Sequence, residues 1–419
     1  MRGILYFTII SGFFACAFFQ YDLGPFSIFP FRIFLIVLWL FFMIRLLFFH
    51  ERLDASQIKV KRYLLFLGIW LSYAIFSLFW ADFRIDALRY IGFLLMGSSL
   101  IFFAVLYFNK LKDLRCLYFS WIIVSIPLMG IGFWEVFTKN HLPNSTFFGT
   151  TCLEPSSVFG HSNDFATFLS LSIPFVWAWM RYGEGKWLKW IFGIILLAMS
   201  FFLLAKTFSR ANFLAVALEI GFIFFFLFHL RRRIKIGFLV GLIIVLFSIF
   251  SLRIPLRISH CAYGFFKGFT DPSTSTYAST IERINVIKNS LYLFVTHLGF
   301  GVGAGNIEKH IAHFAKYPTY GATNPHNWWI EILADYGILI FAGYLLFYLG
   351  LIYNLGKIWH KINKRQEKMI CEALLISLIG FFLASISPSS IMASEYQWIF
   401  LAFVLAFLNY FRLKSTSSL

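Results

Sequence analysis

Long apolar stretches separated by short polar segments dominate this sequence. An α-helix that rises about 1.5 Å per residue needs roughly 20 apolar residues to cross about 30 Å of hydrocarbon. Apolar stretches of about that length lie at 4–19, 31–49, 63–80, 90–108, 115–137, 164–180, 187–204, 210–229, 233–251, 327–353, 367–386 and 394–411. The pattern predicts an all-α integral membrane protein with about 12 transmembrane helices. The first stretch follows Arg2 like a signal peptide, but without a small-residue cleavage site we expect a retained helix.

Basic residues between these stretches predict the orientation. If the N-terminus is cytoplasmic, 22 of the 36 Lys and Arg fall in cytoplasmic segments and 5 in the short loops of the opposite face. Lys and Arg are enriched in cytoplasmic loops. We therefore expect both termini in the cytoplasm.

The same alternation leaves one long extracytoplasmic segment, 252–326, between spans 9 and 10. It divides the chain into spans 1–9 (1–251), this segment, and spans 10–12 (327–419). Within it, 270–280 is rich in Ser and Thr, and we expect it to be flexible. Positions three and four residues apart are then apolar over 281–294, namely Ile284, Ile287, Leu291 and Phe294. This spacing predicts an amphipathic helix at the outer membrane interface.

Composition excludes several classes of protein. Hydrophobic residues make up 60% of the chain and charged residues 13%, which does not fit a soluble core. The net charge of +17 lies in short clusters between apolar stretches rather than on one soluble face, so nucleic-acid binding is not expected. The five cysteines lack metal or redox spacing. A disulfide between Cys152 and Cys261, both on the predicted outer side, is the remaining alternative.

Three cationic or titratable side chains fall at the predicted outer boundary. Arg210 opens the eighth span, Arg283 lies in the amphipathic helix, and His326 precedes the tenth span. Each has a simple explanation by itself: an arginine reaching lipid headgroups, a solvated helix face, or an interfacial histidine. Together they suit a diphosphate leaving group and a hydroxyl nucleophile. The guanidinium groups would neutralise the departing charge, and the imidazole would take the proton.

Neighbouring residues are candidates for support. Glu331 follows His326 by about one turn and would orient a base or an arginine, and Asn327 lies next to the histidine. Gly303 belongs to the run LGFGVGAGN, where four glycines alternate. The run lacks the strand context of a dinucleotide site. A tight glycine turn is the favoured interpretation, and backbone amides presented to a phosphate are the alternative.

Ionisable residues inside the predicted spans give a competing hypothesis. Glu219, Glu135 and Arg45 lie within spans, where charged groups are often functional. A secondary transporter or flippase would use such groups near the membrane midplane. Structural hydrogen bonding is the simpler explanation, and it is the one we favour.

Several stretches resemble the O-antigen ligase and polysaccharide polymerase family of bacterial membrane glycosyltransferases. They are FGHSNDFATFLSLSIPF (159–175), FSRANFLAVALE (208–219), IERINVIKNSLYLFVTHLGFGVGAGN (281–306) and NPHNWWIEILADYGILIF (324–341). The resemblance implies a GT-C-like enzyme of the bacterial cytoplasmic (inner) membrane, with an extracytoplasmic site. It implies a donor glycan on a polyprenyl diphosphate and an inverting reaction without metal, nucleotide or other cofactor.

The resemblance also implies roles for individual residues. Arg210 and Arg283 would bind the diphosphate, and His326 would activate the acceptor hydroxyl. The acceptor stays open. A polymerase extends another lipid-linked repeat, for example of a capsule or teichuronic acid, whereas a ligase transfers the glycan to the lipid A core or to protein. We favour a polymerase.

Overall fold

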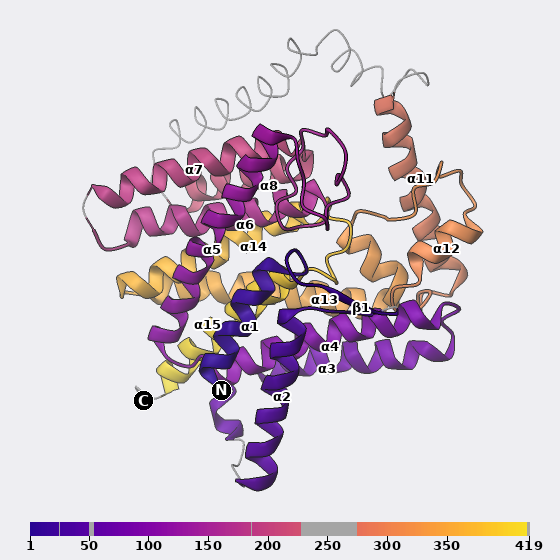
Figure 1. The fold of residues 1–419 in the computed structure, drawn as a ribbon. Helices are drawn as coiled ribbons and strands as arrows, with labels where there is room; N and C mark the ends of the chain where they lie inside the picture. Colours follow the sequence, from indigo (N-terminus) through magenta and orange to yellow (C-terminus); the bar gives the residue numbers. More distant parts are fainter. Residues whose placement is uncertain (25, 50–53, 186, 228–274, 417–419) are drawn as a thin grey trace.

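The computed structural model describes residues 1–419 except 25, 50–53, 186, 228–274 and 417–419 (Figure 1). Helices form nearly all of the regular structure in this part of the chain. The strands within it are β1 (Tyr21–Leu23) and β2 (Phe26–Ile28), which form a short antiparallel hairpin. The predicted all-α membrane protein is therefore confirmed, with this hairpin as a small local exception.

Helices occupy every predicted span except 233–251, which lies outside the described residues. They are α1 (Arg2–Phe14), α2 (Pro30–Phe48), α3 (Lys61–Phe76), α4 (Arg84–Tyr107), α5 (Leu111–Thr138), α6 (Ser162–Tyr182), α7 (Leu188–Lys206), α8 (Arg210–Phe222), α13 (Trp328–Lys361), α14 (Arg365–Ala384) and α15 (Glu395–Thr416). Within the described residues, seven helices are long and apolar enough to cross a membrane: α2, α3 with its 3-10 extension, α4, α5, α7, α13 and α15. The total of 12 spans remains a prediction.

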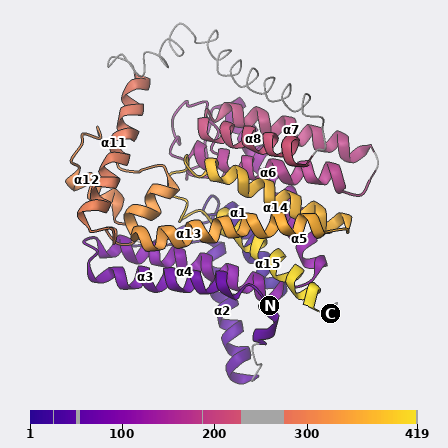
Figure 2. The ribbon, with the colours of Figure 1, turned by 180° about the vertical axis from the view of Figure 1, so that it is seen from behind.

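Two helices of the C-terminal part lie in the middle of the bundle. In both views, α13 and α14 lie between the α6–α8 group and the α3–α4 pair (Figures 1 and 2). α14 packs against α6 and α8, while α15 packs against α4. Helix α6 is almost entirely buried, yet it carries buried polar side chains such as Thr167 and Ser170.

Loops that were predicted to share a membrane face contact one another. At one end, Phe83 contacts Asn306, and Ser209 contacts Ser387. At the other end, Arg2 hydrogen-bonds Asn109 across predicted cytoplasmic segments. These contacts thus divide the loops into the same two groups that the distribution of Lys and Arg predicts. Which set faces the cytoplasm remains a prediction.

The segment between spans 9 and 10 contains two described helices. α11 (Ser275–Thr296) and α12 (Ile307–Phe314) stand at one end of the bundle, on the right in Figure 1 and on the left in Figure 2. They share a small core with the following turn and α13, made of Val286, Leu293, Val302, Ile307, Ile311 and Ala334. The outer segment is therefore a packed element joined to the bundle.

Two features of this region differ from the sequence analysis. α11 begins at Ser275, so helix covers part of the stretch 270–280 that was expected to be flexible. α12 was not predicted, although Ile307, Ile311 and Phe314 have helical spacing. The predicted helix over 281–294 is part of α11, in which Ile284 and Leu291 lie on an exposed face and Val286 and Leu293 form the packed face; its position at the membrane interface stays a prediction.

The tenth predicted span is interrupted. Gly337 has φ 76° and ψ −178° inside α13, so a stub of Trp328–Tyr336 precedes a longer helix that reaches Lys361. The alternating glycines Gly299, Gly301, Gly303 and Gly305 all have positive φ, and the first two lie against this break. A Cβ on Gly301 would lie 2.5 Å from the carbonyl oxygen of Asp335. The predicted glycine turn with close backbone approach is confirmed.

Candidate functional site

Arg210, Arg283 and His326 lie on three separate elements that meet at one end of the bundle. Arg210 is the first residue of α8, Arg283 lies in α11, and His326 precedes α13 by two residues. Arg210 lowers the pKa of Arg283, and Arg283 lowers that of His326, so Arg283 lies within electrostatic reach of both. The structure thus brings together side chains that are separated by 73 and 43 positions in the sequence.

The two arginines form a concentrated positive charge. Both side chains remain accessible. The pKa of Arg283 is lowered, first by partial desolvation and then by the charge of Arg210, while Glu282 acts in the opposite direction. Two guanidinium groups within reach of each other favour an anion between them, because it relieves their mutual repulsion.

A buried polar network fixes the start of α8. The Ser209 hydroxyl contacts the Ser387 hydroxyl at 2.8 Å and accepts a hydrogen bond from Asn212 at 2.9 Å. Asn212 also donates to Thr167 and accepts from Ser170, both on α6. These bonds tie the residue before Arg210 to α6 and to the connection between α14 and α15.

The backbone of His326 adopts an unusual conformation. Its φ is 46°, in the left-handed region that a non-glycine residue rarely occupies. The His326 amide donates to Oδ1 of Asn324 at 2.7 Å. Asn324 Nδ2 in turn donates to Glu308 on α12 and to the carbonyl oxygen of Ser389. The conformation of the histidine is therefore set by contacts from two separate segments.

The imidazole of His326 is held in its neutral form. Its pKa is lowered to about 4, first by burial, then by the charges of Arg283 and His161, with hydrogen bonding to the backbone of Pro388 and Ser387 acting in the opposite direction. Nδ1 is buried and has no hydrogen-bond partner among the described residues. The hydrogen bond to the backbone of Pro388 and Ser387 is therefore made by Nε2. Because a carbonyl oxygen only accepts, Nε2 carries the proton and Nδ1 carries the lone pair.

The supporting candidates take structural positions around this site. Asn327 caps α13, because its Oδ1 accepts from the amides of Trp329 and Ile330 at 3.1 and 3.3 Å. Glu331 is buried one turn later, close to Tyr90. Gly303 donates its amide to the carbonyl oxygen of Asp335 at 3.0 Å.

The glycine turn directs its amides toward protein. Besides Gly303, the Val302 amide donates to the carbonyl oxygen of Ala334 at 2.8 Å, and the Ala304 amide donates to the Ser77 hydroxyl at 3.1 Å. These three groups are engaged by α13 and by the end of α3. They join the outer segment to the bundle, and this geometry does not favour the phosphate-binding alternative.

Sequence reasoning did not assign the connection between α14 and α15, 385–394, to the site. Besides its bonds to Ser209 and Asn324, this connection accepts the Trp328 amide at the Ser385 carbonyl at 3.1 Å. Its Ser389 hydroxyl donates to Asp164 at 3.3 Å. The polar run SISPSS after an apolar helix marks an ordered turn, but nothing in its local pattern indicates contact with a distant histidine.

His161 is the second group that was not proposed as a site residue. It is the N-cap of α6, and its ring centroid lies 6.3 Å from that of His326. Burial lowers its pKa first, and Arg283 lowers it further. A polar His-Ser-Asn run before a long apolar helix predicts a cap, but only the fold places it beside His326.

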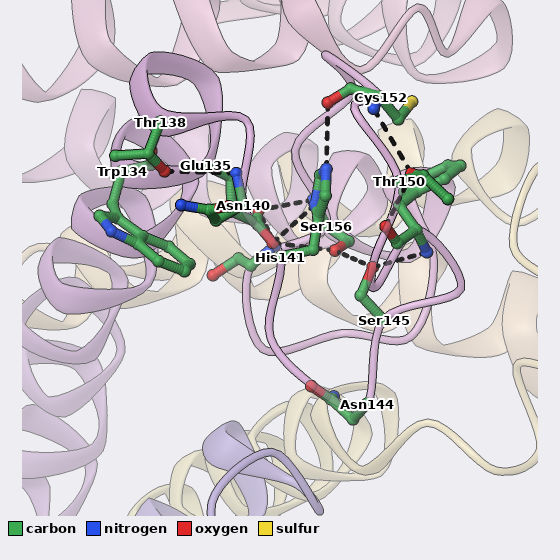
Figure 3. A network of polar contacts seen from close by, with 12 residues as sticks. Trp134, Glu135, Thr138, Asn140, His141, Asn144, Ser145, Thr150, Cys152 and Ser156 are labelled. Carbon is green, nitrogen blue, oxygen red and sulfur yellow. Dashed lines mark hydrogen bonds and ion pairs between the residues drawn. The ribbon is translucent and has the colours of Figure 1, made fainter.

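Glu135 has a structural explanation (Figure 3). It lies at the end of α5, fully buried, and accepts hydrogen bonds from the Ser156 and Ser157 amides at 2.8 and 2.6 Å. His141 Nδ1 lies 3.1 Å from the same carboxylate, and His141 Nε2 lies 3.1 Å from the Cys152 carbonyl oxygen. Glu135 therefore fastens the loop 139–161, as the structural interpretation predicted.

Glu219 differs from Glu135. It is buried in α8 against Gly380 of α14, and neither carboxylate oxygen has a hydrogen-bond partner among the described residues. Arg45 lies in the last turn of α2. The alternative Cys152–Cys261 disulfide involves Cys261, which lies outside the described residues. Within the described part of the chain, no cluster of three or more His, Cys, Asp or Glu side chains is arranged to hold a metal.

Comparison with known proteins places these features in a family. Residues 194–345 match the family described as O-antigen ligase, and this stretch contains both arginines and His326. The chain is also 35% identical over 422 residues to the teichuronic acid biosynthesis protein TuaE of Bacillus subtilis (strain 168), covering 98% of this chain and 84% of the relative. The chain therefore belongs to the O-antigen ligase and polysaccharide polymerase family of membrane proteins that build polysaccharides.

Proposed function

We propose that this protein is a glycosyltransferase that moves a glycan from a polyprenyl diphosphate carrier to an acceptor hydroxyl on the outer face of the bacterial cytoplasmic membrane. The observation that carries the proposal is the convergence of Arg210, Arg283 and His326 at one end of the bundle, with both arginine side chains exposed. Membership of the family supports polysaccharide assembly in general, and the residues supply the finer chemistry.

The arginines bind the donor. Their guanidinium groups are suited to a diphosphate, which offers several oxygens to planar donor forks. When the bond between the anomeric carbon and the diphosphate oxygen breaks, negative charge grows on the leaving group. Arg210 and Arg283 stabilise that charge, so they favour the transition state more than the bound donor.

His326 takes the proton. The acceptor oxygen attacks the anomeric carbon from the side opposite the diphosphate, which inverts the configuration. The acceptor hydroxyl loses its proton to the neutral imidazole, and the polyprenyl diphosphate leaves as an anion. A lowered pKa keeps this imidazole unprotonated at neutral pH, which a general base requires.

We propose a second lipid-linked repeat as the acceptor, so that the reaction lengthens a cell-surface polysaccharide. The name of the relative TuaE refers to teichuronic acid biosynthesis, which supports polymer formation. Transfer to the lipid A core or to protein, the ligase reaction, is the alternative. Both reactions use the same donor site and differ only in the hydroxyl that enters it.

Reconstitution with a lipid-linked repeat tests the proposal. Purified protein in liposomes with an undecaprenyl-diphosphate-linked repeat unit should form longer glycans and release undecaprenyl diphosphate. His326→Ala and Arg283→Ala should abolish both products, whereas His313→Ala, on an exposed histidine of α12, should not. Movement of the intact lipid-linked unit across the bilayer without any new glycosidic bond would instead identify a flippase.

A further inference from the structure

His161 presents one nitrogen to the protein, and the other has no hydrogen bond among the described residues. As the N-cap of α6, it accepts the Asn163 amide at Nδ1, at a distance of 3.2 Å. An amide nitrogen donates only, so Nδ1 carries a lone pair. In the neutral ring the proton then lies on Nε2.

His161 lies close to His326 and Arg283. Its ring lies 6.3 Å from the ring of His326, and Arg283 acts electrostatically on both. The ring of Phe147 also packs against His161, with the ring centroids 5.6 Å apart. Burial and the positive neighbour lower the pKa of His161, so the ring is neutral at pH 7 and its N–H is a donor. The N-terminus of the 21-residue helix α6 adds partial positive charge at the same place.

We propose that His161 is a third ligand of the donor diphosphate, giving the leaving group a hydrogen bond from Nε2 beside the two arginines. This inference rests on the proposed function and adds a residue to its donor site. A neutral N–H donor helps to orient the diphosphate, and it adds no further positive charge next to Arg283.

The two imidazoles then have different roles. The lone pair of His161 is occupied by the Asn163 amide, so this ring cannot accept the proton of the acceptor hydroxyl. His326 has the opposite arrangement, since its Nδ1, which is buried before substrate binds, has no hydrogen-bond partner among the described residues and keeps its lone pair for the acceptor hydroxyl. One ring donates to the leaving group, and the other accepts from the nucleophile.

Two substitutions separate the cap from the donor. In His161→Asn, the amide oxygen can replace Nδ1 as the helix cap, and the Nε2 donor is lost. In His161→Gln, the longer amide can place an N–H near the position of Nε2, while the cap is weakened. A purely structural cap predicts damage from Gln and tolerance of Asn. The proposed role predicts the opposite for diphosphate binding: His161→Asn loses affinity and His161→Gln keeps it.

The measurement is binding of farnesyl diphosphate to the purified full chain in nanodiscs, together with KM and kcat for the lipid-linked donor. We expect His161→Asn to weaken binding about tenfold and raise KM, with an unfolding temperature like that of the wild type. His161→Gln should bind within about threefold of the wild type, as expected when a hydrogen bond is kept with altered geometry.

Each other outcome has a defined meaning. Wild-type binding by His161→Asn would overturn the inference. Equal weakening in both variants would also overturn it, because packing against His326 would then explain the effect. If His161→Asn unfolds at a lower temperature, His161→Ser, another good cap without the donor, replaces it in the same comparison. A wild-type protein that forms no glycan and binds no farnesyl diphosphate would contradict the proposed function itself.

Discussion

Asn324 holds the backbone of His326 in a left-handed conformation, since its Oδ1 accepts the His326 amide at 2.7 Å where φ is 46°. Asn324 is itself held by Glu308 and by the Ser389 carbonyl oxygen. The position of the imidazole therefore depends on a side chain that need not touch any substrate.

Replacing Asn324 should lower the rate of glycan transfer without removing the donor site. In Asn324→Ala, the backbone of His326 relaxes from a conformation that costs about 1–3 kcal/mol to hold, so the imidazole moves out of position. We expect kcat to fall about tenfold and binding of farnesyl diphosphate to stay unchanged. Unaltered kcat in normally inserted protein would show that this hydrogen bond does not position His326.

The pH dependence of transfer should reflect the low pKa of His326. An ordinary histidine has a pKa of about 6.5 and would lose its activity as a base below that pH. The pKa of His326 is lowered to about 4, so the neutral form persists at lower pH. We expect kcat/KM to stay level as the pH falls from 7.5 to about 5 and to decline only near pH 4. A limb centred near 6.5 would contradict this assignment.

The glycine turn should tolerate no side chain at Gly301. A Cβ there would lie 2.5 Å from the Asp335 carbonyl oxygen, at a φ of 83°. Gly301→Ala should therefore destabilise the protein by about 3 kcal/mol or more, through both overpacking and backbone strain. Gly92→Ala in α4 is the matched control, since a Cβ there meets nothing within 4 Å. Thermal unfolding in detergent measures both, and equal unfolding temperatures would refute the close approach.

The two intramembrane glutamates should respond differently to neutral substitution. Glu135→Gln replaces one acceptor oxygen by a donor, so at least one bond to the loop 139–161 is lost, at a cost of about 1–3 kcal/mol. Faster amide hydrogen exchange in the loop 139–161 would show that this bond is lost. Glu219→Gln should leave glycan transfer unchanged, since that carboxyl group has no hydrogen-bond partner among the described residues. Loss of transfer in Glu219→Gln would favour a proton-coupled function.

The sequence predicted the elements better than their mutual arrangement. Apolar length located the helices because a lipid environment demands it, and residue types identified Arg210, Arg283 and His326 as candidates. The break at Gly337 was not predicted, because one glycine in a long apolar stretch does not by itself interrupt a helix. His161 was likewise missed, since its proximity to His326 depends on how α6 and the outer segment pack.

The interruption at Gly337 also bears on how the enzyme meets different membranes. A spanning helix adapts to bilayer thickness by changing its tilt. Here the stub Trp328–Tyr336 is fastened to the glycine turn by backbone bonds at Ala334 and Asp335, and the Ile338 amide donates to the Gly299 carbonyl oxygen at 2.9 Å. Both sides of the break are therefore fastened to the glycine turn, which should hold the residues before α13 in position when the bundle changes its tilt. We expect turnover to vary little between lipids of short and long acyl chains.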